Sequence, residues 1–180
     1  MDAAILDAIQ HALASPPLDA LMAGITFLGD FAIPWLIAAC ALLLSPRWRT
    51  YGIAVLIALA LAVIAGHLLL KPLVMRTRPF IEYGFPIIIA PPRGSSFPSS
   101  HTLVSFAAAT ALCCVPKRGR AVAAAKAGAV VLACLIAFSR LYLYVHYPTD
   151  VAAGILIGIG CGFAAVALAR KLRPDRAGAP

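Results

Sequence analysis

Long apolar stretches alternate with short polar segments along the chain, and five of these stretches approach the length of a membrane-spanning helix. About 20 mostly apolar residues are needed, because a helix rises about 1.5 Å per residue and the hydrocarbon core is about 30 Å thick. We predict spans at roughly 20–44, 52–70, 99–115, 121–142 and 149–169, of which the third is short. The pattern therefore predicts an all-α integral membrane protein, a helical bundle of about five transmembrane helices.

The first residues follow a different pattern. Four apolar side chains recur at helical spacing and three polar residues lie between them: Ile5, Leu6, Ile9 and Leu13, with Asp2, Asp7 and Gln10. Such a segment is too short and too polar to cross a bilayer, but it can lie along the membrane surface. We therefore predict an N-terminal interfacial amphipathic helix over residues 2–14, ended by Ser15-Pro16-Pro17.

The composition supports a membrane protein. The hydrophobic share of 62% is well above that of a soluble domain, and only 12% of the residues are charged. The net charge of +8 does not indicate nucleic-acid binding, because the basic residues form short clusters between apolar stretches. The five cysteines lie within those stretches without C-x-x-C spacing, so neither disulfides nor a zinc framework is expected.

Basic clusters follow the first, third and fifth predicted spans: Arg47 and Arg49, then Lys117, Arg118 and Arg120, then Arg170, Lys171, Arg173 and Arg176. With five spans these clusters share one side, which the positive-inside rule assigns to the cytoplasm. Helix 2–14, the polar segment 71–98 and the turn 143–148 then share the outer side. We expect one transmembrane domain over 1–170 and a disordered cytoplasmic tail over 171–180.

Five further basic residues lie on the predicted outer side, where they need another explanation: Lys71, Arg76, Arg78, Arg93 and Arg140. Lys71, Arg78 and Arg140 are below called the three cations. Lys71 and Arg78 are seven residues apart, so on a helix they would share a face. The N-terminus of the third span adds Ser99 and Ser100, and helix N-termini attract anions. Snorkelling at the interface could explain the cations singly, but together they suit a phosphate group.

Two histidines and a carboxylate lie in the same segments. His146 and Asp150 are four residues apart, and a carboxylate beside an imidazole orients it and supports a developing charge. His101 is a second imidazole for a complementary proton transfer. The pair could instead brace a turn, and the three side chains could bind zinc, although neighbouring cations would repel a metal. Nearby Arg76, Glu82, Arg93, Tyr144 and Tyr147 are interpreted as facing water or a headgroup.

These segments resemble the signature of the type-2 phosphatidic acid phosphatase family, which shares its site with vanadium haloperoxidases. That signature is Lys-x6-Arg-Pro, then Pro-Ser-Gly-His, then Ser-Arg-x5-His-x3-Asp, and its order and spacing match residues 71–79, 98–101 and 139–150. Ser100 stands where the motif usually has Gly, and its Cβ narrows the pocket. The family's membrane enzymes usually have six spans, whereas five are predicted here.

The resemblance implies a role for each matched residue. The three cations would hold the phosphate oxygens, and Ser99 and the backbone N–H of Ser100 would add hydrogen bonds. His146 would attack phosphorus and form a phosphohistidine, with Asp150 orienting it. His101 would protonate the leaving oxygen and then activate water. The family needs no metal, so no cofactor is expected.

The resemblance further implies a lipid phosphatase in a bacterial-type inner membrane, with its active site facing the periplasm or exterior. Undecaprenyl diphosphate, released during cell wall synthesis, is the first candidate substrate, and phosphatidylglycerophosphate and phosphatidic acid are the alternatives. Expected partners are this lipid phosphate and the surrounding membrane lipids, and the sequence does not indicate an oligomeric state. A small transporter or channel is the alternative from another class, but its charges would be distributed through the membrane depth.

Overall fold

The computed structural model describes residues 1–116 and 119–173. All regular secondary structure within these residues is helical, which confirms the predicted all-α class. In chain order the elements are α1 (Asp2–Leu13), α2 (Pro16–Gly29), the 3-10 helix η1 (Asp30–Ala32), α3 (Ile33–Leu44), α4 (Arg49–Val63), the π-helix η2 (Ile64–Leu70), α5 (Lys71–Val74), α6 (Pro79–Glu82), α7 (Ser100–Cys113), α8 (Arg120–Tyr142) and α9 (Pro148–Leu172).

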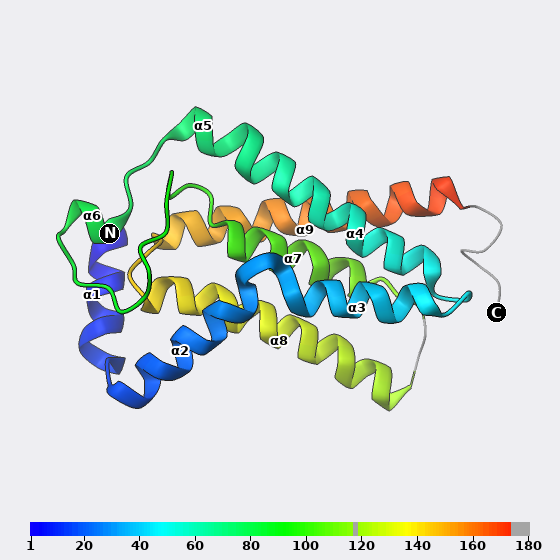
Figure 1. The fold of residues 1–180 in the computed structure, drawn as a ribbon, viewed down its shortest axis with the longest axis horizontal. Helices are drawn as coiled ribbons and strands as arrows, with labels where there is room; N and C mark the ends of the chain where they lie inside the picture. The colour runs from blue at the N-terminus through cyan, green and yellow to red at the C-terminus, as the bar shows by residue number, and fades with distance from the viewer. Residues whose placement is uncertain (117–118, 174–180) are drawn as a thin grey trace.

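The described chain has four helical segments long and apolar enough to cross a membrane: Pro16–Leu44, Arg49–Glu82, Arg120–Tyr142 and Pro148–Leu172. The shorter α7 is the fifth apolar helix, so the predicted bundle is confirmed. Its 14 residues extend only about 21 Å, less than the hydrocarbon core. Figure 1 shows α7 in the middle of the bundle, beginning further inside than the α8–α9 turn. The residues at its N-terminus are therefore recessed below the end of the molecule.

Helices α7 and α9 pack closely along a stripe of small residues in α9, Gly154, Gly158 and Gly162, whose four-residue spacing is typical of close helix contacts. A Cβ atom at Gly158 would lie 2.5 Å from the carbonyl oxygen of Leu103, and one at Gly162 would lie 2.7 Å from that of Ala107. Side chains at these positions would push the helices apart. Glycine therefore fixes the first turn of α9 beside the first turn of α7.

Helix α1 lies across one end of the bundle, roughly perpendicular to the long helices (Figure 1). Its apolar face inserts Leu6, which is fully buried against Tyr144 and Tyr147 of the α8–α9 turn. On its polar face, Asp7 accepts a hydrogen bond from the hydroxyl of Tyr144 at 2.6 Å. The predicted amphipathic helix is thus confirmed, and it covers the turn that carries His146.

The predicted shared helix face of Lys71 and Arg78 is wrong. Helix α5 ends at Val74, and Met75 adopts a left-handed conformation with φ 45°. Arg78 is extended, with φ −81° and ψ 149°, because the proline that follows disfavours the helical conformation. The two cations approach each other through the loop that they bind, as described below. The π-helix η2, which directly precedes Lys71, was not predicted.

The first predicted span is interrupted. Between α2 and α3, Phe31 and Ala32 adopt φ values of 54° and 56°, which bulky L-residues rarely adopt. Each such residue costs on the order of 1 kcal/mol. Asp30 begins this break, halfway along an otherwise apolar segment.

The α3–α4 connection, the start of α8 and the end of α9 lie at the end of the bundle opposite α1 (Figure 1). Arg47, Arg49, Arg120, Arg170 and Lys171 therefore gather at one end, as predicted. Lys117, Arg118 and Arg176 lie outside the described residues, as does 174–180 of the tail that we expected to be disordered. Helix α9 extends to Leu172.

Candidate active site

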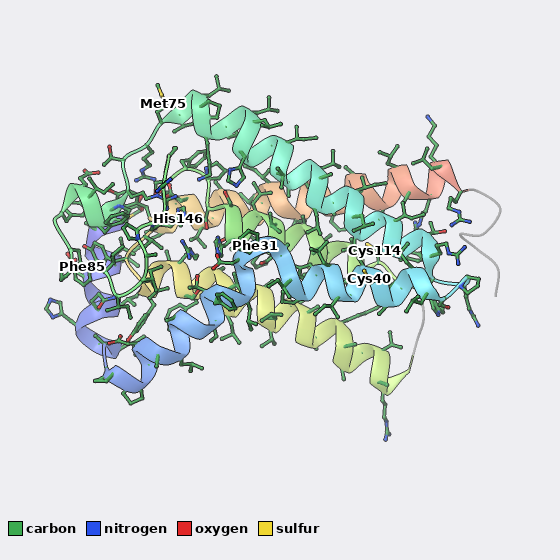
Figure 2. The ribbon with its side chains drawn as sticks, viewed as in Figure 1. Phe31, Cys40, Met75, Phe85, Cys114 and His146 are labelled. Atoms are coloured by element: carbon green, nitrogen blue, oxygen red, sulfur yellow. The ribbon has the colours of Figure 1, made fainter. Side chains whose placement is uncertain are left out.

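The three predicted motif segments meet at the end of the bundle that α1 covers, where Figure 2 shows His146. The turn between α8 and α9 carries this histidine. The backbone N–H groups of Val145 and His146 both donate to the carbonyl oxygen of Arg140, at 3.2 and 3.3 Å. Tyr144 takes a φ of 57° to close the turn. The imidazole is consequently held in one place and is only 2% exposed.

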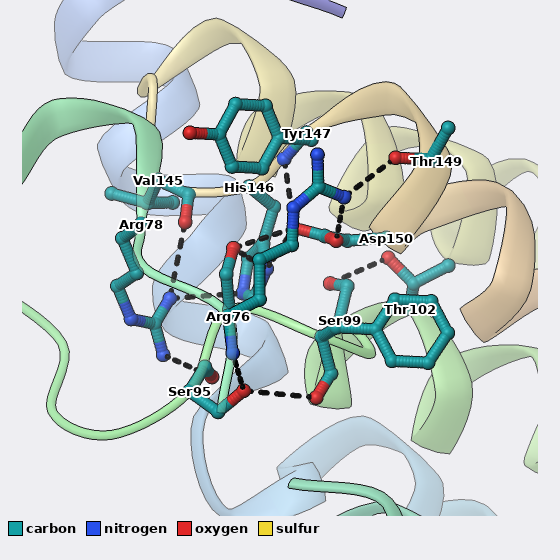
Figure 3. Close-up of polar contacts among 12 residues, drawn as sticks. Arg76, Arg78, Ser95, Ser99, Thr102, Val145, His146, Tyr147, Thr149 and Asp150 are labelled. Atoms are coloured by element: carbon teal, nitrogen blue, oxygen red, sulfur yellow. Dashed lines mark hydrogen bonds and ion pairs between the residues drawn. The ribbon is translucent and has the colours of Figure 1, made fainter. Parts of the chain in front are cut away.

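The neighbours of His146 define its tautomer (Figure 3). Nη1 of Arg78 lies 3.1 Å from Nε2, and a guanidinium can only donate, so Nε2 carries the lone pair. Nδ1 therefore carries the hydrogen and faces Oδ2 of Asp150 at 3.5 Å. Burial, together with Arg140 and Arg78, lowers the pKa of His146 to about 3, although Asp150 opposes this shift. The imidazole is thus neutral, as a nucleophile must be, at physiological pH.

The carboxylate of Asp150 is fully buried and is held by several donors (Figure 3). Its Oδ2 accepts from the backbone N–H of Tyr147 at 2.9 Å and from the hydroxyl of Ser96 at 2.5 Å. Its Oδ1 accepts from Nη1 of Arg76 at 2.7 Å. The contact with Tyr147 also caps α9, because Asp150 is the third residue of that helix. The same carboxylate therefore starts the helix and orients His146.

Sequence reasoning missed Ser96 and did not predict the contacts that Arg76 makes with Asp150 and Tyr147. Ser96 Oγ donates to Asp150, and it also lies 3.4 Å from Nδ1 of His146. The only sequence signal for Ser96 is its position two residues before the Pro98-Ser99 motif. Arg76 was interpreted as facing water or a headgroup, but its guanidinium pairs with Asp150 and stacks on the Tyr147 ring at 3.8 Å. Both residues support the orienting carboxylate.

Two of the three cations are held by carbonyl groups of the 93–95 loop. Lys71 Nζ donates to the carbonyl oxygen of Ser95 at 2.6 Å. Arg78 donates through Nε to that of Gly94 at 3.1 Å and through Nη2 to that of Ser95 at 3.4 Å. Its Nη1 also reaches the carbonyl oxygen of Val145 at 3.1 Å. The loop thus brings together two cations that no common helix carries.

Two buried polar side-chain atoms have no hydrogen-bond partner among the described residues, Nε of Arg140 and Oγ of Ser100. Arg140 is 3% exposed, and its Nη1 donates to the hydroxyl of Thr26. Leaving a buried donor unpaired costs about 1–3 kcal/mol, and charged groups cost more. Both atoms belong to residues predicted to bind phosphate, and a group with several anionic oxygens could accept from both. Ser100 thus brings a donor that the usual glycine lacks.

Ser99 connects α7 to α9. Its backbone N–H donates to the carbonyl oxygen of Asp150 at 3.2 Å, and its hydroxyl accepts from Thr102 Oγ1 at 2.9 Å. Because Thr102 is the donor, the hydroxyl hydrogen of Ser99 remains available to another acceptor. Helix α7 begins at Ser100, so its first backbone N–H groups point out of the helix end. Such an end can bind an anion.

The second predicted histidine, His101, has a partner that was not predicted. Its Nε2 lies 2.9 Å from Oδ1 of Asp30, at the break between α2 and α3. The described residues contain no group of three His, Cys, Asp or Glu side chains arranged to hold a metal ion. His101 and His146 each pair with a separate carboxylate.

The site thus combines a buried imidazole whose Nε2 accepts from Arg78, a carboxylate fixed by several donors, and the further cations Lys71 and Arg140. Such a set of groups is suited to phosphoryl transfer. The sequence profile of the PAP2 superfamily matches residues 50–174. The chain therefore belongs to the PAP2 superfamily and is an integral membrane phosphatase that hydrolyses phosphate esters.

Relatives and solved structures agree with this assignment. The chain is 35% identical to the decaprenylphosphoryl-5-phosphoribose phosphatase of Mycobacterium tuberculosis, over 89% of this chain and 86% of that protein. It is 33% identical to an undecaprenyl-diphosphatase of Sulfolobus acidocaldarius, over 73% and 62%. Its fold is similar to the crystal structure of Aquifex aeolicus LpxE, with a TM-score of 0.78 and 26% identity over 92% and 94% of the chains. The PAP2-type phosphatidylglycerolphosphate phosphatase of Bacillus subtilis gives a TM-score of 0.77 at 26% identity, over 97% and 87%.

Proposed function

We propose that this phosphatase removes the terminal phosphate of a polyprenyl-linked lipid, with undecaprenyl diphosphate as the first substrate, through a phosphohistidine on His146 and without a metal. The observation that carries the proposal is the environment of His146. Its Nε2 carries the lone pair of the ring and lies 3.1 Å from Nη1 of Arg78. An anion drawn to the three cations would meet this lone pair.

The proposed reaction has two steps. In the first, Nε2 of His146 attacks phosphorus while the three cations and Ser99 hold the nonbridging oxygens. The imidazole becomes positively charged as the P–N bond forms, and the carboxylate of Asp150 stabilises that charge through Nδ1–H. In the second, water attacks the phosphohistidine and releases inorganic phosphate. His101 gives a proton to the leaving oxygen in the first step and takes one from water in the second.

Two cavities beside the site support an amphiphilic substrate. A cavity of about 640 Å³ is lined by four cations, Lys71, Arg76, Arg78 and Arg93, together with apolar side chains such as Met75 and Ile81. A second cavity, of about 540 Å³, borders His101 and is lined mainly by apolar side chains such as Phe31, Leu59, Val63 and Val104. His67 lines both. A phosphorylated headgroup would fit the first, and the start of an apolar chain would fit the second.

A second candidate substrate is decaprenylphosphoryl-5-phosphoribose. The observation that favours it is the match to the Mycobacterium tuberculosis phosphatase of that name, which covers 89% of this chain. Both candidates carry a polyprenyl chain and a terminal phosphate. Phosphatidylglycerophosphate, suggested by the Bacillus subtilis structure, and phosphatidic acid are the glycerolipid alternatives.

We also propose that the protein lies in the inner membrane, with His146 facing the periplasm or exterior and α9 ending in the cytoplasm. The basic residues at the end opposite α1 support this orientation through the positive-inside rule. The orientation can be tested in intact cells by the accessibility of introduced cysteines. One variant carries Gly84→Cys near the site, and the other carries Arg47→Cys at the opposite end. An impermeant thiol reagent should label only the first, and labelling of only the second would reverse the orientation.

The enzymatic proposal is tested with purified protein in detergent, in the presence of EDTA. The four lipids are compared by kcat/KM for phosphate release, and undecaprenyl diphosphate is expected to give the highest value. A higher value for decaprenylphosphoryl-5-phosphoribose would select the second candidate. Loss of all activity in EDTA, restored by a divalent cation, would contradict the metal-free mechanism. Vanadate, which resembles a trigonal phosphoryl group, should inhibit.

A further inference from the structure

We propose that Asp30 is a positioning residue for His101, which holds Nε2 of the imidazole, stabilises its protonated form and leaves Nδ1 to exchange protons with the substrate. This inference rests on the proposed function, because it assigns a partner to the histidine that serves there as acid and base. No motif residue of the matched signature lies in α2 or η1, so the assignment comes from the structure alone.

The contact between the two side chains is direct. Oδ1 of Asp30 lies 2.9 Å from Nε2 of His101, a distance typical of a charge-assisted hydrogen bond. A carboxylate only accepts, so Nε2 must be the nitrogen that carries a hydrogen in this pair. No described residue contributes a hydrogen bond to Nδ1 of His101. Proton transfer to or from the substrate is therefore assigned to Nδ1.

The last residue of α2, Gly29, has no side chain, and the imidazole of His101 lies close to its backbone. A Cβ atom at Gly29 would lie 2.5 Å from Cδ2 of His101 and 3.1 Å from a methyl group of Ile136. Any larger residue at position 29 would displace the ring. Glycine therefore makes room for His101 one residue before the carboxylate that binds it.

The strained break that follows includes a residue that protein packing does not explain. Phe31 and Ala32 adopt positive φ angles, yet the Phe31 side chain is 89% exposed and so gains little from protein contacts. Figure 2 shows Phe31 at this break, partway along the bundle between His146 and Cys40. Strained residues of this kind concentrate at functional sites. Here the backbone break begins at Asp30, the residue whose side chain contacts His101.

The location of Asp30 also calls for a function. It lies within Pro16–Leu44, a segment apolar enough to cross a membrane, where an ionisable side chain is costly and usually functional. His101 is the hydrogen-bond partner of its carboxylate among the described residues. Asp30, Ser100 and His101 line the same cavity of about 540 Å³, so the pair borders the space proposed for the substrate.

The proposed chemistry balances in both steps. As Nε2 of His146 bonds to phosphorus, the bond from phosphorus to the leaving oxygen breaks and its electron pair stays on that oxygen. The oxygen takes the proton from Nδ1 of His101, which becomes neutral. Water then attacks phosphorus and gives a proton to the same Nδ1, while the P–N electron pair returns to His146. Asp30 stays ionised throughout and stabilises the imidazolium that begins and ends the cycle.

The test compares leaving groups, because general acid catalysis matters most when the leaving oxygen is strongly basic. Two amphiphilic phosphates with the same alkyl tail serve as substrates, one an alkyl phosphate and the other a nitrophenyl phosphate. In Asp30→Asn, kcat/KM should fall about 10- to 100-fold for the alkyl phosphate and less than about 3-fold for the nitrophenyl phosphate. Asp19→Asn is the matched control, since Asp19 lies in α2, the helix that directly precedes Asp30, and its carboxylate accepts from the hydroxyl of Tyr142 rather than from His101. It should leave the ratio of the two values unchanged.

The double variant Asp30→Asn/His101→Asn should have the same ratio of kcat/KM for the alkyl phosphate to that for the nitrophenyl phosphate as His101→Asn alone. Asp30 acts through His101, so its loss should have no additional effect on this ratio. An equal loss for both substrates, or no loss, would overturn the role of Asp30. If the wild-type protein released no phosphate from any lipid, or if His146→Ala kept full activity, the proposed function would fail and this inference with it. The two failures are distinguishable, because the proposed function is measured in the wild-type protein and in His146→Ala, whereas the role of Asp30 is measured in Asp30→Asn.

Discussion

The described residues include two histidine–aspartate pairs, and these pairs differ in how firmly they are held. His146 and Asp150 have side chains that are 2% and 0% exposed, and the carboxylate accepts from Tyr147, Ser96 and Arg76 as well. In the other pair, the side chain of His101 is 20% exposed and that of Asp30 is 42% exposed. Among the described residues, Asp30 binds only the imidazole. One pair is fixed on several sides and the other at a single contact.

The difference matches the two tasks proposed above for His146 and His101. A nucleophile must lie in line with the bond that breaks, and an error of about 1 Å is costly. An acid that later acts as a base must serve two oxygens in turn, first that of the leaving group and then that of water. A looser pair beside a cavity is suited to this task. If the His146–Asp150 pair must be held rigidly, changes to its residues and contacts should cause large losses of activity.

The largest effect is expected for His146→Ala. It removes the nucleophile, so kcat should fall by about 10⁴-fold or more, measured as phosphate release from the best lipid. Thermal unfolding in detergent serves as the control for folding. A folded variant with more than a tenth of the wild-type kcat would contradict the role of His146.

A smaller but still large loss is expected for Asp150→Asn, about 10³-fold in kcat. Both carboxylate oxygens accept from donors, so either orientation of the amide places its NH₂ group against Arg76 or against Tyr147 and Ser96. The amide should therefore lose these hydrogen bonds, and His146 should no longer be held in its orientation. If kcat stayed within a few-fold of wild type while KM rose, Asp150 would bind substrate rather than orient the nucleophile.

The rigid pair also depends on how closely α9 lies against α7. Gly158→Ala places a Cβ atom 2.5 Å from the carbonyl oxygen of Leu103, and we expect a loss of about 1–3 kcal/mol in stability together with lower activity. Gly160 is the matched control, because a Cβ atom there meets nothing within 4 Å. Gly160→Ala should be neutral or stabilising by up to about 1 kcal/mol. The melting temperatures of the two variants are compared in one detergent. Equal values would contradict the conclusion that close packing of α9 against α7 requires glycine at position 158.

The smallest effect is expected for Ser96→Ala, about 10-fold in kcat/KM, which corresponds to one hydrogen bond to a charged group. The neighbouring Ser95→Ala should lose less. Its hydroxyl contacts only the backbone N–H of Arg76 and the carbonyl oxygen of Phe97, and the carbonyl group that binds Lys71 is retained. A larger loss in Ser95→Ala than in Ser96→Ala would show that the loop matters more than the carboxylate contact.

The sequence predicts the helices well because their signals are local. Apolar length defines the spans, the amphipathic pattern defines α1, and the spacing of three glycines indicates a close helix contact, although it does not name α7 as the partner of α9. Motif spacing likewise indicates which residues belong to one site. The roles of those residues remain predictions until the variants above are measured.

What the sequence does not predict depends on the path of the backbone. The seven-residue spacing of Lys71 and Arg78 would put them on one face of a helix, whereas here the loop carbonyl groups of 93–95 bring them together. The break at Phe31 and Ala32 has no glycine or proline at either position to indicate it. The contacts of Asp30 with His101 and of Ser96 with Asp150 join residues 71 and 54 positions apart, so no local pattern encodes them.

The short central helix α7 has a practical consequence for how this enzyme should be assayed. Because α7 extends only about 21 Å, its N-terminus lies below the level of the surrounding helix ends. A substrate that reaches this depth travels in the plane of the membrane or micelle, so the rate follows its mole fraction among the amphiphiles. Adding detergent at constant substrate should therefore slow turnover by simple dilution of the surface. Kinetic constants for this protein carry meaning only when the detergent or lipid concentration is stated with them.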